Sequence, residues 1–348
     1  MKKNNQSLSR RKFIGSSAAL AAGVALSGPS LFGAPAFLKS LKKPNSLVKG
    51  VQIGVITYSY RSMPDQSAEA TLKYVLESGI SAIELMGDPA EAYAGKPENP
   101  LDRRAFYTLM RAKRSGETLS DSQQKELAEM QEQMEAYNRE VIHWRSTVSM
   151  DKFIELRKMY NDAGVSIFAF KPSAFGKNNT DAEMDWGMRA AKALGASHVT
   201  LEHPSDDAMT QKLGDLGEKH DIYVGYHGHE QQTPTFWDTA LKQSKYNGIN
   251  LDLGHYVAAG NTDALEFIKD KHNRILSMHI KDRQTPENGK ANLPWGNGDT
   301  PIKQALQLMR DKKYKFPAVV ELEYRIPEDS DAVKEVNKCR LYCEVQLG

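Results

Sequence analysis

Ionisable side chains recur in seven short segments of this chain, each directly after a run of apolar residues; six segments carry acids or imidazoles, and the segment 169–172 carries Lys171. The segments contain combinations such as Glu-His-Pro, Tyr-His-Gly-His-Glu and Leu-Asp-Leu-Gly-His, and they hold five of the nine histidines. Their ranges are 83–87, 169–172, 200–204, 225–230, 251–255, 278–283 and 320–324. Carboxylates combined with neutral imidazoles suit a hard or borderline divalent cation. One such segment alone is more often a helix cap or a solvated loop, but seven together indicate a shared site.

The apolar runs before these segments have the length and the β-branched or aromatic content of strands. We expect eight strands, at 51–58, 80–85, 165–170, 198–201, 222–226, 248–251, 275–280 and 317–322. Amphipathic segments alternate with them, at 68–77, 181–194, 207–219, 235–241, 263–269, 301–309 and 332–345. This alternation predicts an α/β fold, a (β/α)8 TIM barrel closed by right-handed crossovers. In such a barrel the chemistry lies at the C-terminal strand ends, where the seven segments fall.

The stretch between the second and third expected strands is too long for a single crossover helix. We therefore expect a long helical insertion after strand 2, at about 90–161. Within it, Leu127, Met130, Met134 and Tyr137 recur at helical spacing on a polar background. Core packing is the favoured interpretation of this stripe, and a contact surface in a homo-oligomer is the alternative.

Four side chains from the later strands are the candidate metal ligands. Glu202, Asp252, His279 and Glu321 follow the fourth, sixth, seventh and eighth expected strands and would point inward around one centre. The seven segments offer no thiolate to favour a softer metal, so one divalent ion of Mn, Mg, Co or Zn is expected. The alternative is that the four are separate, solvated side chains.

The strand-end motifs resemble those of the xylose isomerase-like TIM-barrel superfamily, in its sugar phosphate isomerase/epimerase branch (D-tagatose 3-epimerase and inosose dehydratase). The resemblance covers residues 51 to about 325, and its most specific parts are Asp-Leu-Gly-His and His-Ile-Lys-Asp. It implies one divalent metal held by Glu202, Asp252, His279 and Glu321, with Glu323 as an alternative to Glu321. It also implies substrate contacts, which we assign to Glu84, Lys171, His227, His229, His255, Lys281 and Trp295.

The resemblance further implies a metal-dependent isomerase or epimerase that acts on a keto-sugar or sugar derivative. Glu202 and Glu321 would be the catalytic carboxylates, transferring a proton on either face of the carbon beside the carbonyl, through an enediolate. The same site could work as a lyase or dehydratase, eliminating from 3-keto glycosides or keto-polyols with a histidine as the acid. A non-catalytic periplasmic sugar-binding protein is the alternative of another class.

The N-terminus has the features of an export signal. Residues 1–36 carry five cations and no acid, then an apolar stretch, and Ala34-Pro35-Ala36 offers a small-residue cleavage site. Ser9-Arg10-Arg11-Lys12-Phe13-Ile14 resembles a twin-arginine signal, which implies the twin-arginine export machinery as a partner and a periplasmic or exported location. Residues 37–50 are a predicted linker, and 51–348 the barrel. An uncleaved membrane anchor is the alternative.

Composition and charge narrow the function classes. The 348 residues are 40% hydrophobic and 26% charged, with only 2 cysteines, which excludes collagen, wholesale disorder and a disulfide scaffold. The net charge is +2, and without the five signal cations it is −3. Nucleic acid is therefore not an expected partner, and an apurinic endonuclease-like activity is disfavoured. A small carbohydrate is the expected substrate.

Overall fold

The protein is described here by a computed structural model, in which residues 43–348 are placed. The predicted export signal, residues 1–36, and the first residues of the predicted linker, 37–42, lie outside the described residues.

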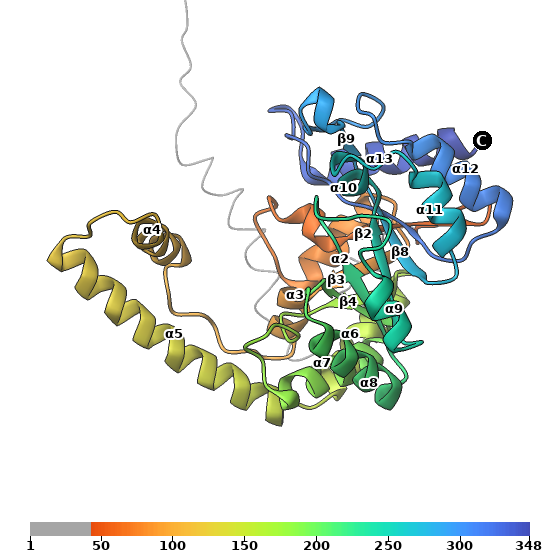
Figure 1. Cartoon of the computed structure of the whole chain (residues 1–348). Helices are drawn as coiled ribbons and strands as arrows, with labels where there is room; N and C mark the ends of the chain where they lie inside the picture. Colours follow the sequence, from red (N-terminus) through yellow and green to blue (C-terminus); the bar gives the residue numbers. More distant parts are fainter. Residues whose placement is uncertain (1–42) are drawn as a thin grey trace, which may run out of the picture. The chain divides into compact units, whose positions relative to one another are not determined.

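Eight parallel strands form a closed barrel (Figure 1). They are β2 (Val51–Ile56), β3 (Ala82–Met86), β4 (Ser166–Lys171), β5 (His198–Glu202), β6 (Tyr223–His227), β7 (Asn247–Asp252), β8 (Ile275–Ile280) and β11 (Ala318–Val320). Each pairs with its predecessor in this order, and β11 closes the ring by pairing with both β8 and β2. Apolar residues such as Ile53, Val199 and Ile249 are fully buried because helices cover the outside of the strands. The predicted TIM barrel is confirmed.

The outer layer follows the predicted helices closely. It consists of α2 (Ala68–Glu77), α6 (Asp151–Asp162), α7 (Asp181–Leu194), α8 (Asp207–His220), α9 (Asp238–Gln243), α11 (Ala264–Lys271), α12 (Ile302–Lys312) and α13 (Ala332–Leu347). Local caps define several ends. Ser67 accepts a hydrogen bond at the start of α2, and Thr180 and Glu183 form a capping box on α7. Gly195 ends α7 at φ +78°, a left-handed conformation that glycine adopts without strain.

Short elements surround the C-terminal ends of the strands. They are η2 (Thr57–Tyr60), α3 (Gly87–Tyr93), α10 (Leu253–Ala258) and η3 (Pro286–Asn288), together with the antiparallel pair β9 (Asp282–Arg283) and β10 (Asn292–Leu293). At the start of the described chain, β1 (Leu47–Val48) pairs antiparallel with β2. The last part of the predicted linker is therefore a strand attached to the barrel.

The insertion contains α4 (Arg103–Arg114) and α5 (Asp121–Thr147), a helical hairpin with a small core of its own (Figure 1). Leu127 is buried there against Phe106 and Leu109 of α4, and Met130 and Met134 pack beside it. Leu127, Met130 and Met134 of the predicted stripe thus pack within the hairpin, as the favoured interpretation expected, whereas Tyr137 lies outside this cluster.

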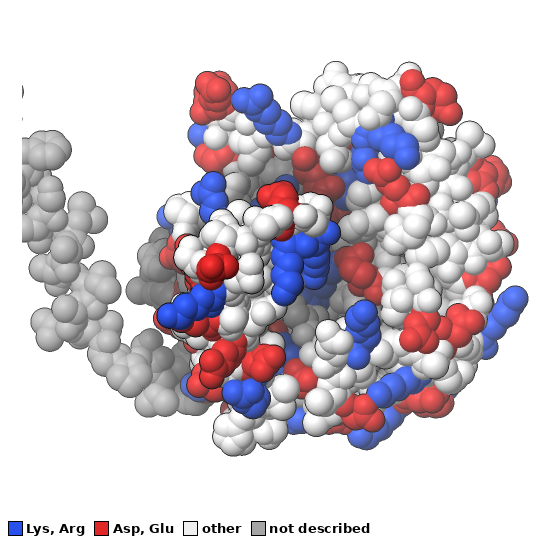
Figure 2. Space-filling view, turned by 60° about the vertical axis from the view of Figure 1, so that its left-hand side comes forward, with Lys and Arg blue, Asp and Glu red and all other residues white. Residues whose placement is uncertain are grey.

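The surface shown in Figure 2 has basic and acidic side chains interspersed, without a large area of one sign. Among residues 43–348, no helix combines the length and the apolar character needed to cross a bilayer.

The C-terminal end of α5 is held to the barrel by a buried ion pair. The Arg145 guanidinium lies 2.6 Å from Glu183 Oε1 on α7 and 3.4 Å from Glu91 Oε2 on α3, and all three side chains are buried. The guanidinium also lies over the ring of Trp186, 4.9 Å from its centroid. Residues far apart in sequence therefore share one buried charge network.

We expect Arg145→Ala to lower the free energy of unfolding by about 3 kcal/mol, because two buried carboxylates lose their shared cation. Urea unfolding followed by circular dichroism measures this change. Arg139→Ala, an exposed position on the same helix, is the control and should change stability by less than about 0.5 kcal/mol. Equal effects of the two substitutions would contradict the assigned role of Arg145.

Candidate metal centre

Four buried side chains meet at the C-terminal ends of neighbouring strands. His227 ends β6, Asp252 ends β7, His279 lies in β8, and Glu321 directly follows β11. One ligand atom from each lies within 4.8 Å of the corresponding atoms of the other three. We call these four residues the metal group. Three of them are sequence-predicted ligands, and His227 was expected to contact substrate instead.

The structure does not bring Glu202 into the metal group. Its Cα pairs with that of His227 across β5 and β6, and paired residues of parallel strands point to the same face. The Glu202 side chain is 55% exposed, however, while His227 is buried. Glu202 binds Lys171 Nζ at 2.9 Å through one carboxylate oxygen and faces His229 Nε2 at 3.3 Å through the other. Of Glu202 and His227, only His227 therefore lies beside Asp252, His279 and Glu321.

Hydrogen bonds fix the orientation of both imidazoles in the metal group. His227 Nδ1 lies 2.7 Å from Asn250 Oδ1, which leaves Nε2 free to bind a cation. His279 Nε2 lies 2.7 Å from Glu84 Oε2, which leaves Nδ1 facing Glu321 Oε2 at 3.1 Å. Metal-binding histidines in proteins are oriented in this way by a partner on the second ring nitrogen.

Glu84 is the hydrogen-bond partner of His279 and lies outside the metal group. Its side chain is fully buried, and its second oxygen accepts a hydrogen bond from Thr200. Both carboxylate oxygens are thus engaged within the protein, and the substrate contact predicted for Glu84 stays a prediction.

Lys281 has a different position from the one expected of a substrate contact. Its ammonium is buried among three carboxylates, 3.0 Å from Asp252 Oδ2, 2.8 Å from Glu321 Oε2 and 2.6 Å from Glu323 Oε2. The lysine contacts both Glu321 and Glu323, and of these two only Glu321 is a member of the metal group. Gly254 makes room for this arrangement, because a Cβ there would lie 2.7 Å from the Lys281 carbonyl oxygen and would also overlap its side chain.

The charges of the metal group are buried and act strongly on one another. Burial raises the pKa of Asp252 to about 7, against the opposing attraction of the Lys281 ammonium. Burial also opposes charge on His279, yet Glu84 and Glu321 raise the pKa of its ring to about 10. Asp252 Oδ2 receives no hydrogen bond of regular geometry, although it is buried. This oxygen and the two oriented imidazoles fit a divalent cation.

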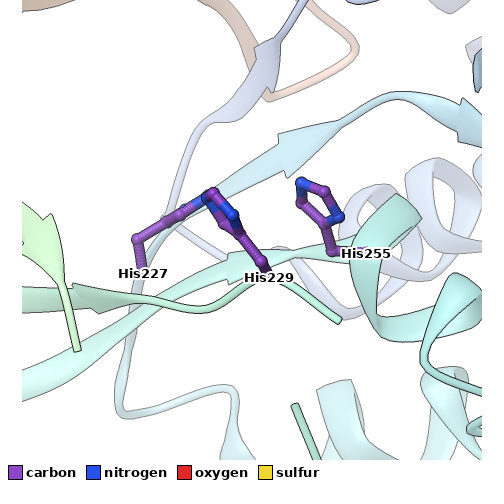
Figure 3. Close-up of side chains that lie close together, drawn as sticks. All are labelled: His227, His229 and His255. Atoms are coloured by element: carbon purple, nitrogen blue, oxygen red, sulfur yellow. The ribbon is translucent and has the colours of Figure 1, made fainter. Parts of the chain in front are cut away.

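A second group of three histidines lies beside the first, and Figure 3 shows their rings close together. Here His227 is joined by His229 from the loop after β6 and by His255 from α10. The rings of His229 and His255 are stacked, with centroids 4.6 Å apart. Since the Nδ1 of His227 is engaged by Asn250, both groups would use the same nitrogen. The second group therefore does not add an independent metal site.

His255 is fixed as a neutral hydrogen-bond donor. Arg283 donates to its Nδ1 at 2.5 Å, so Nε2 carries the proton. Burial, aided by Lys281 and Arg283, lowers the pKa of the ring to about 2. Arg283 is held in turn by Glu230, at 2.7 Å. His255 Nε2 lies 4.0 Å from Asp252 Oδ2. The ring therefore borders the metal group and can donate a hydrogen bond to an oxygen bound there.

Three other predicted site residues, Lys171, Glu202 and Trp295, lie outside the metal group. Lys171 and Glu202 border a cavity of about 250 Å³ whose walls include Phe175 and Leu201. Trp295 packs against Tyr342, with ring centroids 5.8 Å apart, so this ring has a contact on α13.

The loop that carries Trp295 is fastened to β9. Asp282 accepts hydrogen bonds from the backbone of Gly296 at 2.7 Å and of Gly298 at 2.9 Å. The sequence analysis missed the roles of Asp282, Arg283, Asn250 and Gly254. Asp282 and Gly254 lie in the quoted His-Ile-Lys-Asp and Asp-Leu-Gly-His motifs, and Arg283 directly follows the first of these, so the motifs were the available signal.

Known structures share this fold at low sequence identity. A sugar phosphate isomerase/epimerase from Parabacteroides distasonis is 17% identical, with a TM-score of 0.54 over 86% of this chain and 94% of that one. A xylose isomerase domain protein from Alicyclobacillus acidocaldarius is 15% identical, with a TM-score of 0.55 over 85% and 98%. A probable 3-DHS dehydratase from Bacillus anthracis is 14% identical, with a TM-score of 0.54 over 83% and 97%. No curated protein matches the chain.

The family model described as "Xylose isomerase-like TIM barrel" matches residues 72–341. This match covers most of the chain and the whole of the metal group. The chain belongs to the xylose isomerase-like TIM barrel family.

Proposed function

We propose that this chain is a divalent-metal-dependent sugar isomerase or epimerase that acts on a keto-sugar or a sugar derivative. The observation that carries the proposal is the buried metal group of His227, Asp252, His279 and Glu321 at the C-terminal mouth of the barrel. The isomerase/epimerase name of one structural neighbour agrees with it.

The types of ligand in the metal group narrow the choice of metal ion. Two imidazoles with two carboxylates suit Zn²⁺, Co²⁺ or Mn²⁺ better than Mg²⁺, which favours oxygen ligands and keeps several waters. A bound divalent ion would polarise a sugar carbonyl and so make the neighbouring C–H more acidic. Proton transfer is then the task of the protein side chains.

Glu202 is the side chain best placed to move that proton. It lies outside the metal group, and Lys171 and His229 each contact one of its oxygens and so orient the carboxylate for acid–base work. The cavity beside Lys171 and Glu202 offers space for substrate at this carboxylate. His255 Nε2 is the neutral donor for an oxygen of the same substrate.

Elimination by a lyase or dehydratase is the second candidate. One specific observation favours it: of the two catalytic carboxylates predicted for epimerisation, only Glu321 is at the metal group, while Glu202 is paired with an imidazole. His229 could protonate a departing oxygen while a carboxylate takes the proton from carbon. A dehydratase among the structural neighbours is in keeping with this chemistry.

Deuterium incorporation tests the catalytic proposal. The protein with its metal is incubated in D2O with a panel of keto-sugars and 3-keto glycosides, and products are followed by NMR and mass spectrometry. Carbon-bound deuterium in an intact sugar identifies an isomerase or epimerase, and release of water or an aglycone identifies a lyase. Tight binding of a sugar without any exchange would instead favour the sugar-binding alternative.

We expect Glu202→Gln to slow deuterium exchange by about 100-fold or more, as loss of a general acid–base group does. The metal content should stay unchanged, because Glu202 is not in the metal group. Glu218→Gln, at an exposed position on α8, is the control. Unchanged exchange in Glu202→Gln would refute its catalytic role, whereas loss of metal would mean that Glu202 is a ligand.

We expect two substitutions to lower the metal affinity by different amounts. Asp252→Asn should remove most bound metal, because a charged ligand becomes a neutral amide. Glu84→Gln should weaken affinity by about 10- to 100-fold, because it disturbs the partner of His279. Elemental analysis and titration against a chromophoric chelator measure both, with Glu77→Gln on α2 as the control. Full metal content in Asp252→Asn would contradict the assigned ligand set.

We also propose that the chain is exported through a twin-arginine signal and handles sugars or glycosides that arrive from outside the cell. The support is the Ser9-Arg10-Arg11-Lys12-Phe13-Ile14 motif. Changing Arg10 and Arg11 together to Lys should retain the precursor in the cytoplasm, as measured by cell fractionation and immunoblotting. Lys2→Gln is the matched control, and normal export of the double variant would refute the proposal.

A further inference from the structure

Lys281 is the one cation whose ammonium contacts members of the metal group in the described chain. Its Nζ lies 3.0 Å from Asp252 Oδ2 and 2.8 Å from Glu321 Oε2. The third contact, at 2.6 Å, is to Glu323, which lies outside the metal group. The side chain is 2% exposed, so water cannot take the place of these carboxylates.

Packing gives this side chain little freedom to leave. The stem passes over Gly254 at the start of α10, where even a methyl group would collide with Lys281. A lysine buried without partners would lose its proton or unfold the site, so the ammonium depends on the carboxylates that surround it. The carboxylates depend equally on the ammonium when no other cation is present.

A divalent ion in the metal group would meet this ammonium at close range. Metal–oxygen distances to carboxylates are about 2.0–2.2 Å for an ion such as Zn²⁺. Such an ion on Asp252 and Glu321 would therefore lie within a few ångströms of Lys281 Nζ, and two positive charges in a buried site repel strongly. Asp252 and Glu321 therefore cannot fully neutralise the metal ion and the Lys281 ammonium at the same time.

We propose that Lys281 is a resident cation that competes with the divalent metal for Asp252 and Glu321, and that Glu323 receives its ammonium when the metal binds. The metal-free centre is then neutralised by the protein itself, and the barrel can fold before the metal arrives. Lys281 also lowers the affinity for metal. This inference rests on the proposed metal site, and its test separates the two.

The test measures Mn²⁺ affinity of the full chain by competition with a chromophoric chelator. Lys281→Met keeps the length of the stem and removes the charge, and it should bind Mn²⁺ at least about tenfold more tightly. The metal-free variant should unfold at lower urea concentration than the wild type, and Mn²⁺ should stabilise it more. Lys271→Met, which removes a cation paired with Asp238 on the outer helices, should leave the affinity unchanged.

Glu323→Gln tests the second half of the proposal. The ammonium then lacks its alternative partner, so Mn²⁺ affinity should fall several-fold. In the double variant with Lys281→Met, the effect of Glu323→Gln should disappear, because Glu323 acts on the metal through the lysine. A Glu323→Gln effect of the same size in both backgrounds would overturn this coupling.

A further measurement covers the case in which metal-free Lys281→Met does not fold. Protein purified with Mn²⁺ is mixed with excess chelator, and the rate of metal release is compared with that of the wild type. Slower release from Lys281→Met supports competition, and equal or faster release overturns it. Equal affinities of both proteins also overturn it while leaving the metal site intact, whereas absence of binding in both overturns the metal proposal as well.

Discussion

The concentration of negative charge at the mouth of the barrel is the constraint on which the centre depends. Asp252 and Glu321 are buried within a few ångströms of one another, and each needs a positive partner in place of the water it has lost. The chain supplies Lys281 for this purpose, and His279 Nδ1 also faces Glu321 at 3.1 Å. The glycine near the start of α10 allows this arrangement, because a Cβ at Gly254 would collide with Lys281.

A layer of uncharged or paired side chains below the centre determines what the ligands can do. Asn250 and Glu84 each engage one nitrogen of an imidazole, so each ring presents the other nitrogen to the site. Arg283 also engages one nitrogen of His255, but it donates to the lone pair of Nδ1. The other nitrogen, Nε2, therefore carries a proton and is a hydrogen-bond donor. Three histidines of similar appearance in the sequence thus have separate chemical characters. Those characters come from neighbours on other strands.

Much of the architecture could be predicted from the sequence because strands and helices leave local patterns. The eight apolar runs and the caps at Ser67 and Thr180 are signals within a few residues of the elements they define. Asp252, His279 and Glu321 could be placed at the barrel mouth for the same reason. The sequence could not show that His227 and not Glu202 joins the metal group, because the two residues are paired across β5 and β6 and differ only in the direction of their side chains. Glu202 turns outward to Lys171 and His229, and His227 turns inward to Asn250, and both sets of partners come from other parts of the chain. The role of Lys281 was hidden for a related reason, since its partners are separated from it by up to 42 residues.

The α4–α5 hairpin affects how the free energy of unfolding is distributed over the molecule. Its apolar cluster shares no buried residue with the large cluster inside the barrel. Segments with separate apolar interiors open independently, at a smaller free energy than the whole molecule requires. The hairpin can therefore fray, be clipped by a protease or diverge in length while the strands beneath keep their register. Substitutions and changes of length at its outer end therefore leave the charged residues at the mouth of the barrel in place.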